Sequence, residues 1–167
     1  MKKLHLIRHA KSSWQEPNLA DIDRPLSQRG VRACEVMAPE IVKAGCELET
    51  VYCSPASRAT STAQHLSQAV AADTVLRVDR TLYTFDGQRL LAWCRGLDDR
   101  LENSVTEVTI IGHNPALTDF CNFISDSELD NIPTCGYVQL WLDCARWQDL
   151  SSGSATLKAF LYPKQFK

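Results

Sequence analysis

The sequence predicts an α/β fold built on a mainly parallel sheet with an antiparallel pair of strands at one edge. Short apolar runs alternate with helical patterns over residues 4–124, which is typical of parallel strands joined by crossover helices. Residues 137–143 and 157–162 instead alternate apolar and polar side chains, as a half-buried antiparallel pair does. Because no repeat or linker divides the 167 residues, we predict a single domain over 1–167.

The first strand is a short apolar run over residues 4–7 that ends at Arg8 and His9. Lys11 and Ser12 follow directly. In an open α/β sheet, ligands bind in the crevice at the carboxyl ends of the strands. We therefore expect Arg8 and His9 to line that crevice, and we interpret the stretch as the floor of an anion site that contains a nucleophile.

A polar loop leads to the first predicted helix, for which Ser27 has the side chain of an N-cap. Its apolar positions run to Val42, and Gly45 is placed to end the helix. Pro39 falls inside this pattern and lacks the N–H that a helix interior uses. The sequence therefore predicts a kink at Pro39, or two shorter helices.

The next two predicted strands are residues 50–53 and 75–78. The first of these runs into Ser54 and Pro55, which favour an N-cap and a first helical position, with Arg58 in the first turn of the helix. The single apolar stripe of that helix is typical of a helix lying on one face of a sheet.

A further helix is predicted to begin at Asp86, which is a good capping residue. The apolar run of residues 108–112 then predicts a buried strand of a parallel sheet. It ends in His113, Asn114 and Pro115, and a helix with one apolar side follows.

Three predicted strands thus end in groups suited to one anion. They deliver Arg8 with His9, Arg58, and His113. The helix starts predicted after the second and third strands add unpaired backbone N–H groups and the positive end of a helix dipole. If the strands are neighbours, these groups face one volume, and phosphate matches the guanidinium fork.

The net charge, the first apolar run and the cysteines argue against several other classes of function and site. The formal net charge of −2 gives no general electrostatic argument for nucleic acid or a membrane surface as a partner. The apolar run near the start is too short for a signal peptide, so we expect a cytoplasmic protein. Seven cysteines without a C-x-x-C pair predict reduced, buried side chains rather than a metal site.

Four segments carry a resemblance to the histidine phosphatase (phosphoglycerate mutase-like) superfamily. Residues 6–12 resemble its R-H-G/A signature, and residues 23–30 resemble its D-R-P-L-[ST]-x-x-G segment. Residues 52–63 are similar to S-P-x-x-R-A-x-x-T-A, and residues 111–115 to V-G-H-N-P. The short length and the alanine after His9 resemble the compact branch of SixA-type phosphohistidine phosphatases.

This resemblance implies a three-layer α/β/α sandwich around a mainly parallel, mixed sheet. It implies a metal-independent phosphatase without a cofactor, in which His9 is the nucleophile and Arg8, Arg58 and His113 bind the phosphoryl oxygens. Ser12, Lys11 and Asn114 are further candidates for substrate binding. The substrate would be a protein phosphohistidine or another phosphorylated molecule.

No carboxylate stands out as a general acid. Asp86 is explained as a helix cap, and Asp23, Glu16 and Glu107 have no clear relation to the three strand ends. An imidazole leaving group depends on such an acid less than an alkoxide does, which favours phosphohistidine. Two alternatives stay open: a phosphomonoesterase acting on sugar or nucleotide phosphates, and a phosphate-binding module without catalysis.

Overall fold

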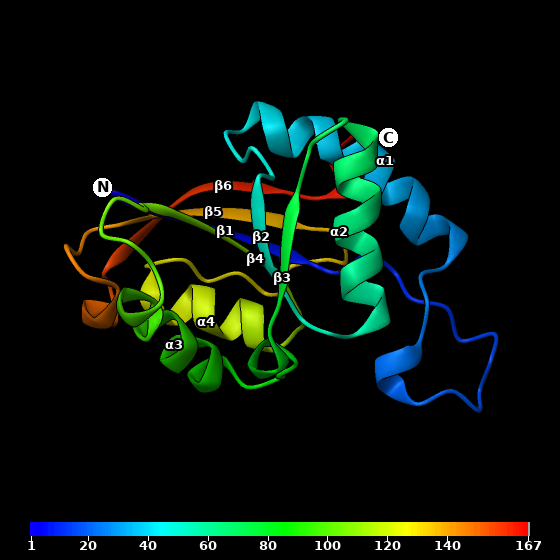
Figure 1. The fold of residues 1–167 in the computed structure, drawn as a ribbon, viewed down its shortest axis with the longest axis horizontal. Coiled ribbons are helices and arrows are strands. Elements are labelled where there is room, and N and C mark those ends of the chain that lie inside the picture. The colour runs from blue at the N-terminus through cyan, green and yellow to red at the C-terminus, as the bar shows by residue number, and fades with distance from the viewer. Residues whose placement is uncertain (167) are drawn as a thin grey trace.

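A computed structural model describes residues 1–166 and contains one six-stranded mixed sheet of order β3-β2-β4-β1-β5-β6 (Figure 1). β1, β2, β3 and β4 are parallel, whereas β5 runs antiparallel to β1 and to β6. The predicted mainly parallel sheet with an antiparallel edge pair is therefore confirmed. The strands are β1 (Lys2–Arg8), β2 (Thr50–Cys53), β3 (Val75–Val78), β4 (Glu107–Gly112), β5 (Tyr137–Leu142) and β6 (Ala155–Leu161).

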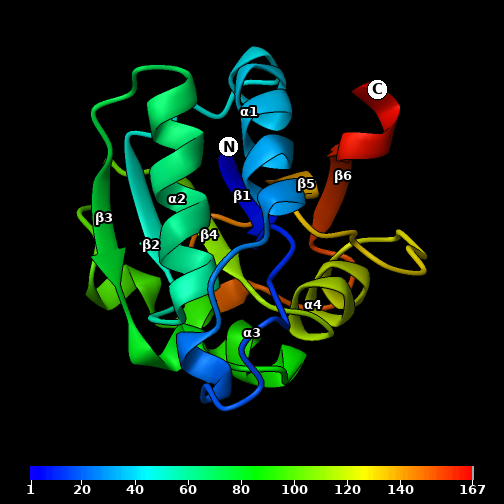
Figure 2. The same ribbon diagram turned by 90° about the vertical axis from the view of Figure 1, so that its right-hand side faces the viewer.

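Two helices cover each face of the sheet, as the predicted three-layer sandwich requires (Figures 1 and 2). One hydrophobic core lies under α1 and α2, and the other lies under α3 and α4. Alternate residues of one strand enter opposite cores, so that Leu6 packs in one and Ile7 in the other. The helices are α1 (Gln28–Lys43), α2 (Ser57–Ala69), α3 (Gly87–Arg95) and α4 (Ala116–Ile124).

The capping predictions are confirmed at two helices. The Ser27 side chain accepts a hydrogen bond from the Gly30 N–H at the start of α1. The Asp86 carboxylate accepts one from the Gln88 N–H at the start of α3. Both side chains satisfy N–H groups that a helix start leaves without an intrahelical partner.

Two local expectations are wrong: the two shorter helices around Pro39 and the start of the second helix. α1 is one continuous helix through Pro39, whose side chain lies on the exposed side, and the kink at Pro39 stays a prediction. α2 begins at Ser57, three residues after the predicted cap; Ser54 is fully buried, and its hydroxyl accepts from the Ala56 N–H just before the helix. Within the 166 residues described, no helix is long and apolar enough to cross a membrane.

Candidate active site

The carboxyl ends of β1, β2 and β4 meet at one edge of the sheet. β4 lies between the other two, and Arg8 is in register with Gly112, the last residue of β4. Figure 2 shows the 3-10 helix η1 (Asp21–Asp23) beside the N-terminal end of α2, at this end of the sheet. The three strand ends are therefore neighbours, as the sequence predicts.

His9 is held by its backbone and its ring. Its N–H donates to the Gly112 carbonyl at 3.1 Å. Its Nδ1 lies 2.7 Å from the Ala10 carbonyl oxygen. A carbonyl can only accept, so Nδ1 carries the proton and Nε2 holds the free lone pair of the neutral ring. The free nitrogen of His9 is thus Nε2.

Burial keeps this imidazole neutral. His9 is 8% exposed. Desolvation, together with the positive charges of Arg58, Arg8 and Arg24, lowers its pKa to about 4. At neutral pH the ring is therefore an uncharged nucleophile among cations.

We expect this lowered pKa to make stability depend on pH. The unfolded chain takes up the His9 proton near pH 6.5, whereas the folded chain takes it up near pH 4. In that window the unfolded state binds more protons, so the free energy of unfolding falls as the pH is lowered. Between pH 7 and pH 4.5, protonation of His9 lowers the free energy of unfolding by about 2 kcal/mol.

Denaturant titrations of the wild type and of His9→Gln at the two pH values measure this contribution. The variant should lose about 2 kcal/mol less than the wild type on acidification, because it has no proton to take up there. Equal losses in the two proteins would contradict the lowered pKa of His9.

Arg58 and His113 lie beside His9. The ring centroids of His9 and His113 are 5.1 Å apart, and Arg58 Nη2 lies 3.5 Å from His113 Nδ1. The guanidinium donates, so Nδ1 accepts and Nε2–H of His113 donates to the Ser54 hydroxyl at 2.8 Å. Burial and the nearby His9 lower the pKa of His113 to about 3. The predicted cap Ser54 is therefore a partner of His113.

Arg8 contributes a buried donor with no partner. Its Nη1 donates to the Ile132 carbonyl at 2.9 Å. Its Nε is the one buried side-chain nitrogen or oxygen in the described chain that has no hydrogen-bond partner. A buried donor without a partner destabilises a protein by roughly 1–3 kcal/mol, and by more when it is charged. An anionic ligand that accepts a hydrogen bond from Arg8 Nε relieves this cost, and its binding free energy becomes more favourable by a similar amount.

The sequence interpretation missed the carboxylate of this site, Asp21. Its Oδ2 accepts from Arg58 Nη2 at 2.9 Å and from the Tyr83 hydroxyl, and its carbonyl accepts from Arg58 Nη1 at 2.7 Å. The Tyr83 and Arg58 hydrogen bonds lower the pKa of Asp21 to about 2. Asp21 therefore orients Arg58 and holds no proton to donate at neutral pH.

Arg24 and Thr62 were also missed as parts of the site. Arg24 is buried, donates to the Ser12 hydroxyl at 2.6 Å and stacks on the Trp14 ring. The buried Thr62 hydroxyl accepts from the Ala10 N–H at 2.8 Å and donates to the Arg58 carbonyl at 2.7 Å. It thereby ties the loop after β1 to the helix that carries Arg58.

The candidates for substrate binding differ in their surroundings. The Ser12 hydroxyl is engaged by Arg24, and the Lys11 side chain is exposed. The Asn114 amide donates to the Ile132 carbonyl at 3.0 Å, and its oxygen accepts from the Thr118 N–H at 3.1 Å. Asn114 thus braces the segment whose Ile132 carbonyl holds Arg8.

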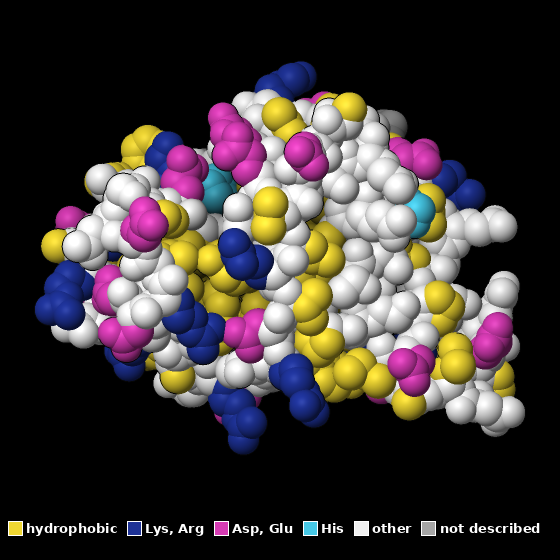
Figure 3. Space-filling model, in the orientation of Figure 1, with side chains coloured by type: hydrophobic (Ala, Val, Ile, Leu, Met, Phe, Trp, Pro, Cys, Tyr) yellow, Lys and Arg dark blue, Asp and Glu magenta, His cyan; other side chains and the backbone are white. Residues whose placement is uncertain are grey.

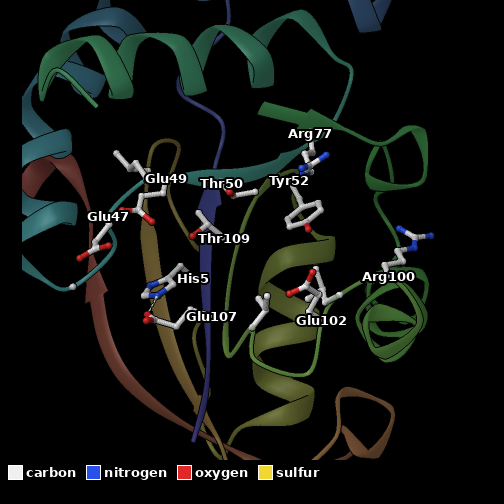
Figure 4. Close-up of a pocket in the computed structure, with 14 residues that line it drawn as sticks. His5, Glu47, Glu49, Thr50, Tyr52, Arg77, Arg100, Glu102, Glu107 and Thr109 are labelled. Carbon is white, nitrogen blue, oxygen red and sulfur yellow. Dashed lines mark hydrogen bonds and ion pairs between the residues drawn. The ribbon is translucent and has the colours of Figure 1, made fainter. Parts of the chain in front are cut away.

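A cavity of about 660 Å³ lies at the opposite end of the sheet (Figure 4). Its wall includes His5, whose Nε2 is 2.9 Å from Glu107 and whose Nδ1 is 2.7 Å from the Tyr137 hydroxyl. The other charged groups on the wall are three carboxylates and two guanidinium groups, from Glu47, Glu49, Glu102, Arg77 and Arg100. None of the residues at the three strand ends lines this cavity, so it is separate from the candidate active site.

No cluster of metal-ligating side chains accompanies the candidate active site. Within residues 1–166, no group of three or more His, Cys, Asp or Glu side chains is arranged to hold a metal ion. The charges that face His9 come from arginines.

A family model described as "Histidine phosphatase superfamily (branch 1)" matches residues 4–84, which include Arg8, His9 and Arg58. This match confirms the resemblance to the histidine phosphatase superfamily. An uncharacterized protein of Mycobacterium leprae is 29% identical over 170 residues, which cover 95% of this chain and 100% of that protein. His113 lies outside the matched residues, and its place beside His9 comes from the fold.

Solved structures of proteins described as phosphatases share the fold. The structure described as the protein histidine phosphatase SixA complexed with tungstate has a TM-score of 0.79 and 21% identity, and the match covers 99% of each chain. A mycobacterial glucosyl-3-phosphoglycerate phosphatase has a TM-score of 0.65 and 14% identity, over 95% of this chain and 97% of that one. The fold is thus shared by proteins described as phosphatases of different substrates. The family match supports a phosphatase activity.

Proposed function

We propose that the chain is a metal-independent phosphatase that hydrolyses protein phosphohistidine through a phosphoryl intermediate on His9. The observation that carries the proposal is the state of His9: a neutral ring with Nδ1–H fixed on the Ala10 carbonyl and with Nε2 free. A neutral nitrogen nucleophile can attack phosphorus and split one transfer into two easier steps.

In the first step, His9 Nε2 forms a bond to phosphorus while the bond from phosphorus to the leaving nitrogen breaks. Arg8 and Arg58 stabilise the charge on the equatorial oxygens, which is the main way in which proteins accelerate phosphoryl transfer. Arg8 offers its unpartnered Nε, and Asp21 holds the guanidinium of Arg58 from one side. Water then attacks phosphorus in the second step, releases phosphate and regenerates neutral His9.

The low pKa of Asp21 favours a substrate with a good leaving group. Its carboxylate is ionised near neutral pH and bound to Arg58, so it cannot protonate a departing alkoxide. An imidazole leaves readily once the ring of the phosphohistidine is protonated in solution. A positioned general acid contributes about 10²- to 10⁴-fold in rate, and its absence penalises alkyl esters by that order.

A substrate comparison tests this proposal. We expect kcat/KM for a phosphohistidine peptide to exceed that for a hexose monophosphate by about 10²-fold or more. Both values should be lost in His9→Gln, which separates this activity from contaminating phosphatases. Comparable values for the two substrates, or strong turnover of one metabolite in a panel of sugar and nucleotide phosphates, would favour the small-molecule phosphatase instead.

A third interpretation of the same residues is a phosphate-binding module without catalytic activity. The free Nε2 of His9 among three arginine charges argues against it, because a binding module needs the cations but not the nucleophile. Failure to hydrolyse both an aryl phosphate and a phosphohistidine peptide would support the binding module.

A further inference from the structure

A groove of about 350 Å³ lies along the outer side of α1, next to the loop that follows His9. Its polar wall is basic and its apolar wall is formed by small and branched side chains. The residues that line it are Lys11, Arg29, Arg32, Ala33, Val36, Thr134 and Pro163.

The groove carries one sign of charge. Three of its lining residues are cations, and among residues 1–166 no Asp or Glu side chain lines it. Within residues 1–166, Lys11, Arg29 and Arg32 take part in no ion pair, and all three are exposed. The whole chain has a net charge of −2, and the face in Figure 3 mixes acidic and basic side chains. The groove is therefore a local electropositive surface that favours an anionic partner.

The groove is fixed relative to the nucleophile. Lys11 is two residues after His9, and its carbonyl accepts from the Ser27 N–H at 2.9 Å. Gly30 of α1 lies so close that a Cβ there would clash with the Lys11 carbonyl oxygen. On the other wall, Thr134 precedes Cys135, whose N–H bonds the Arg8 and His9 carbonyls at 3.1 and 3.0 Å. The groove thus has a fixed position relative to His9, to which both of its walls are tied through the backbone.

The shape fits a polypeptide better than a single small anion. Arg29, Arg32 and Val36 follow the i, i+3, i+7 spacing of one helix face. Seven residues of helix extend over about 10 Å, which is about three residues of an extended peptide. Val36 is 40% exposed and offers an apolar contact beyond the cations.

We propose that this groove binds an acidic segment next to the phosphorylated residue of a protein substrate. The proposal rests on the proposed function, because it concerns the partner of the same active site. The phosphoryl group enters between Arg8, Arg58 and His9, while neighbouring Asp or Glu side chains face Arg29 and Arg32. The groove thereby selects among phosphoproteins by their local charge.

Two peptides with the same phosphohistidine test the groove, one flanked by glutamates and one by serines. We expect the wild type to hydrolyse the acidic peptide with at least about tenfold higher kcat/KM at low salt, and the difference to shrink at high ionic strength. In Arg29→Glu/Arg32→Glu the preference should disappear or reverse, while p-nitrophenyl phosphate hydrolysis stays within about twofold. The matched control is Arg77→Glu/Arg89→Glu, which changes the net charge equally at exposed positions outside the groove.

The contrary outcomes distinguish failure of the groove proposal from failure of the proposed function. Equal kcat/KM for the two peptides in the wild type, or an equal loss in the control variant, would overturn the groove proposal and leave the phosphatase proposal intact. If the wild type prefers sugar phosphates to both peptides, the proposed function fails. In that case, fluorescence anisotropy of the labelled acidic peptide tests binding to the groove independently of catalysis. Unchanged binding in Arg29→Glu/Arg32→Glu overturns the groove proposal. If Arg29→Glu/Arg32→Glu loses activity only toward a bisphosphorylated sugar, the occupant of the groove is a small polyanion, and this result also overturns the groove proposal.

Discussion

Replacing His9 with glutamine is expected to lower kcat/KM for p-nitrophenyl phosphate by about 10⁴-fold or more, because loss of a nucleophile removes the covalent route altogether. Glutamine keeps a polar side chain of similar length but cannot carry the phosphoryl group. Steady-state kinetics of the purified variant measure the effect, with circular dichroism to confirm that the variant is folded.

His65→Gln is the matched control for this substitution. His65 lies on α2, away from the three strand ends, and its replacement should leave kcat/KM within about twofold. A His9→Gln variant that retains a tenth of the wild-type rate would show that the phosphoryl group does not pass through His9.

Replacing Arg8 with methionine is expected to lower kcat/KM by about 10³-fold, since positioned cations contribute on this order to phosphoryl transfer. The substitution also removes the buried Nε that has no protein partner, so inhibition by vanadate should weaken in parallel. Arg8→Lys should recover only part of the loss, because an ammonium cannot form the bidentate contact of a guanidinium.

The matched control for Arg8 is Arg89→Met, which removes an exposed guanidinium from α3 and should change neither rate nor inhibition. If vanadate inhibits Arg8→Met as strongly as it inhibits the wild type, Arg8 does not contact the phosphoryl group.

The strand ends were predictable because their signals are local. An apolar run that stops at Arg8 and His9, or at His113, marks both a buried strand and the polar groups at its end. The parallel order of β2, β4 and β1 then brings these groups together, with Arg58 Nη2 reaching 3.5 Å from His113 Nδ1.

The contacts that orient these groups were not predictable from local patterns. Asp21 is 37 positions from Arg58 and lies in a polar segment without periodicity. Ser54 has the chemistry of a helix cap, and its hydroxyl accepts from the Ala56 N–H at 3.2 Å, but it also accepts from His113 and the helix begins only at Ser57. The contact with His113 is the part that a local pattern does not show. The single domain, the cytoplasmic location and catalysis without a metal stay predictions.

We predict that the phosphoryl group passes through His9, and a rapid-quench experiment tests this most directly. The wild type is mixed with a ³²P-labelled phosphohistidine peptide, quenched in alkali within one turnover, and digested for mass spectrometry. We predict an acid-labile phosphoryl group on His9, formed before phosphate is released, and no labelled enzyme with His9→Gln. Phosphate release at the full rate without labelled enzyme, or label on a residue other than His9, would contradict the account.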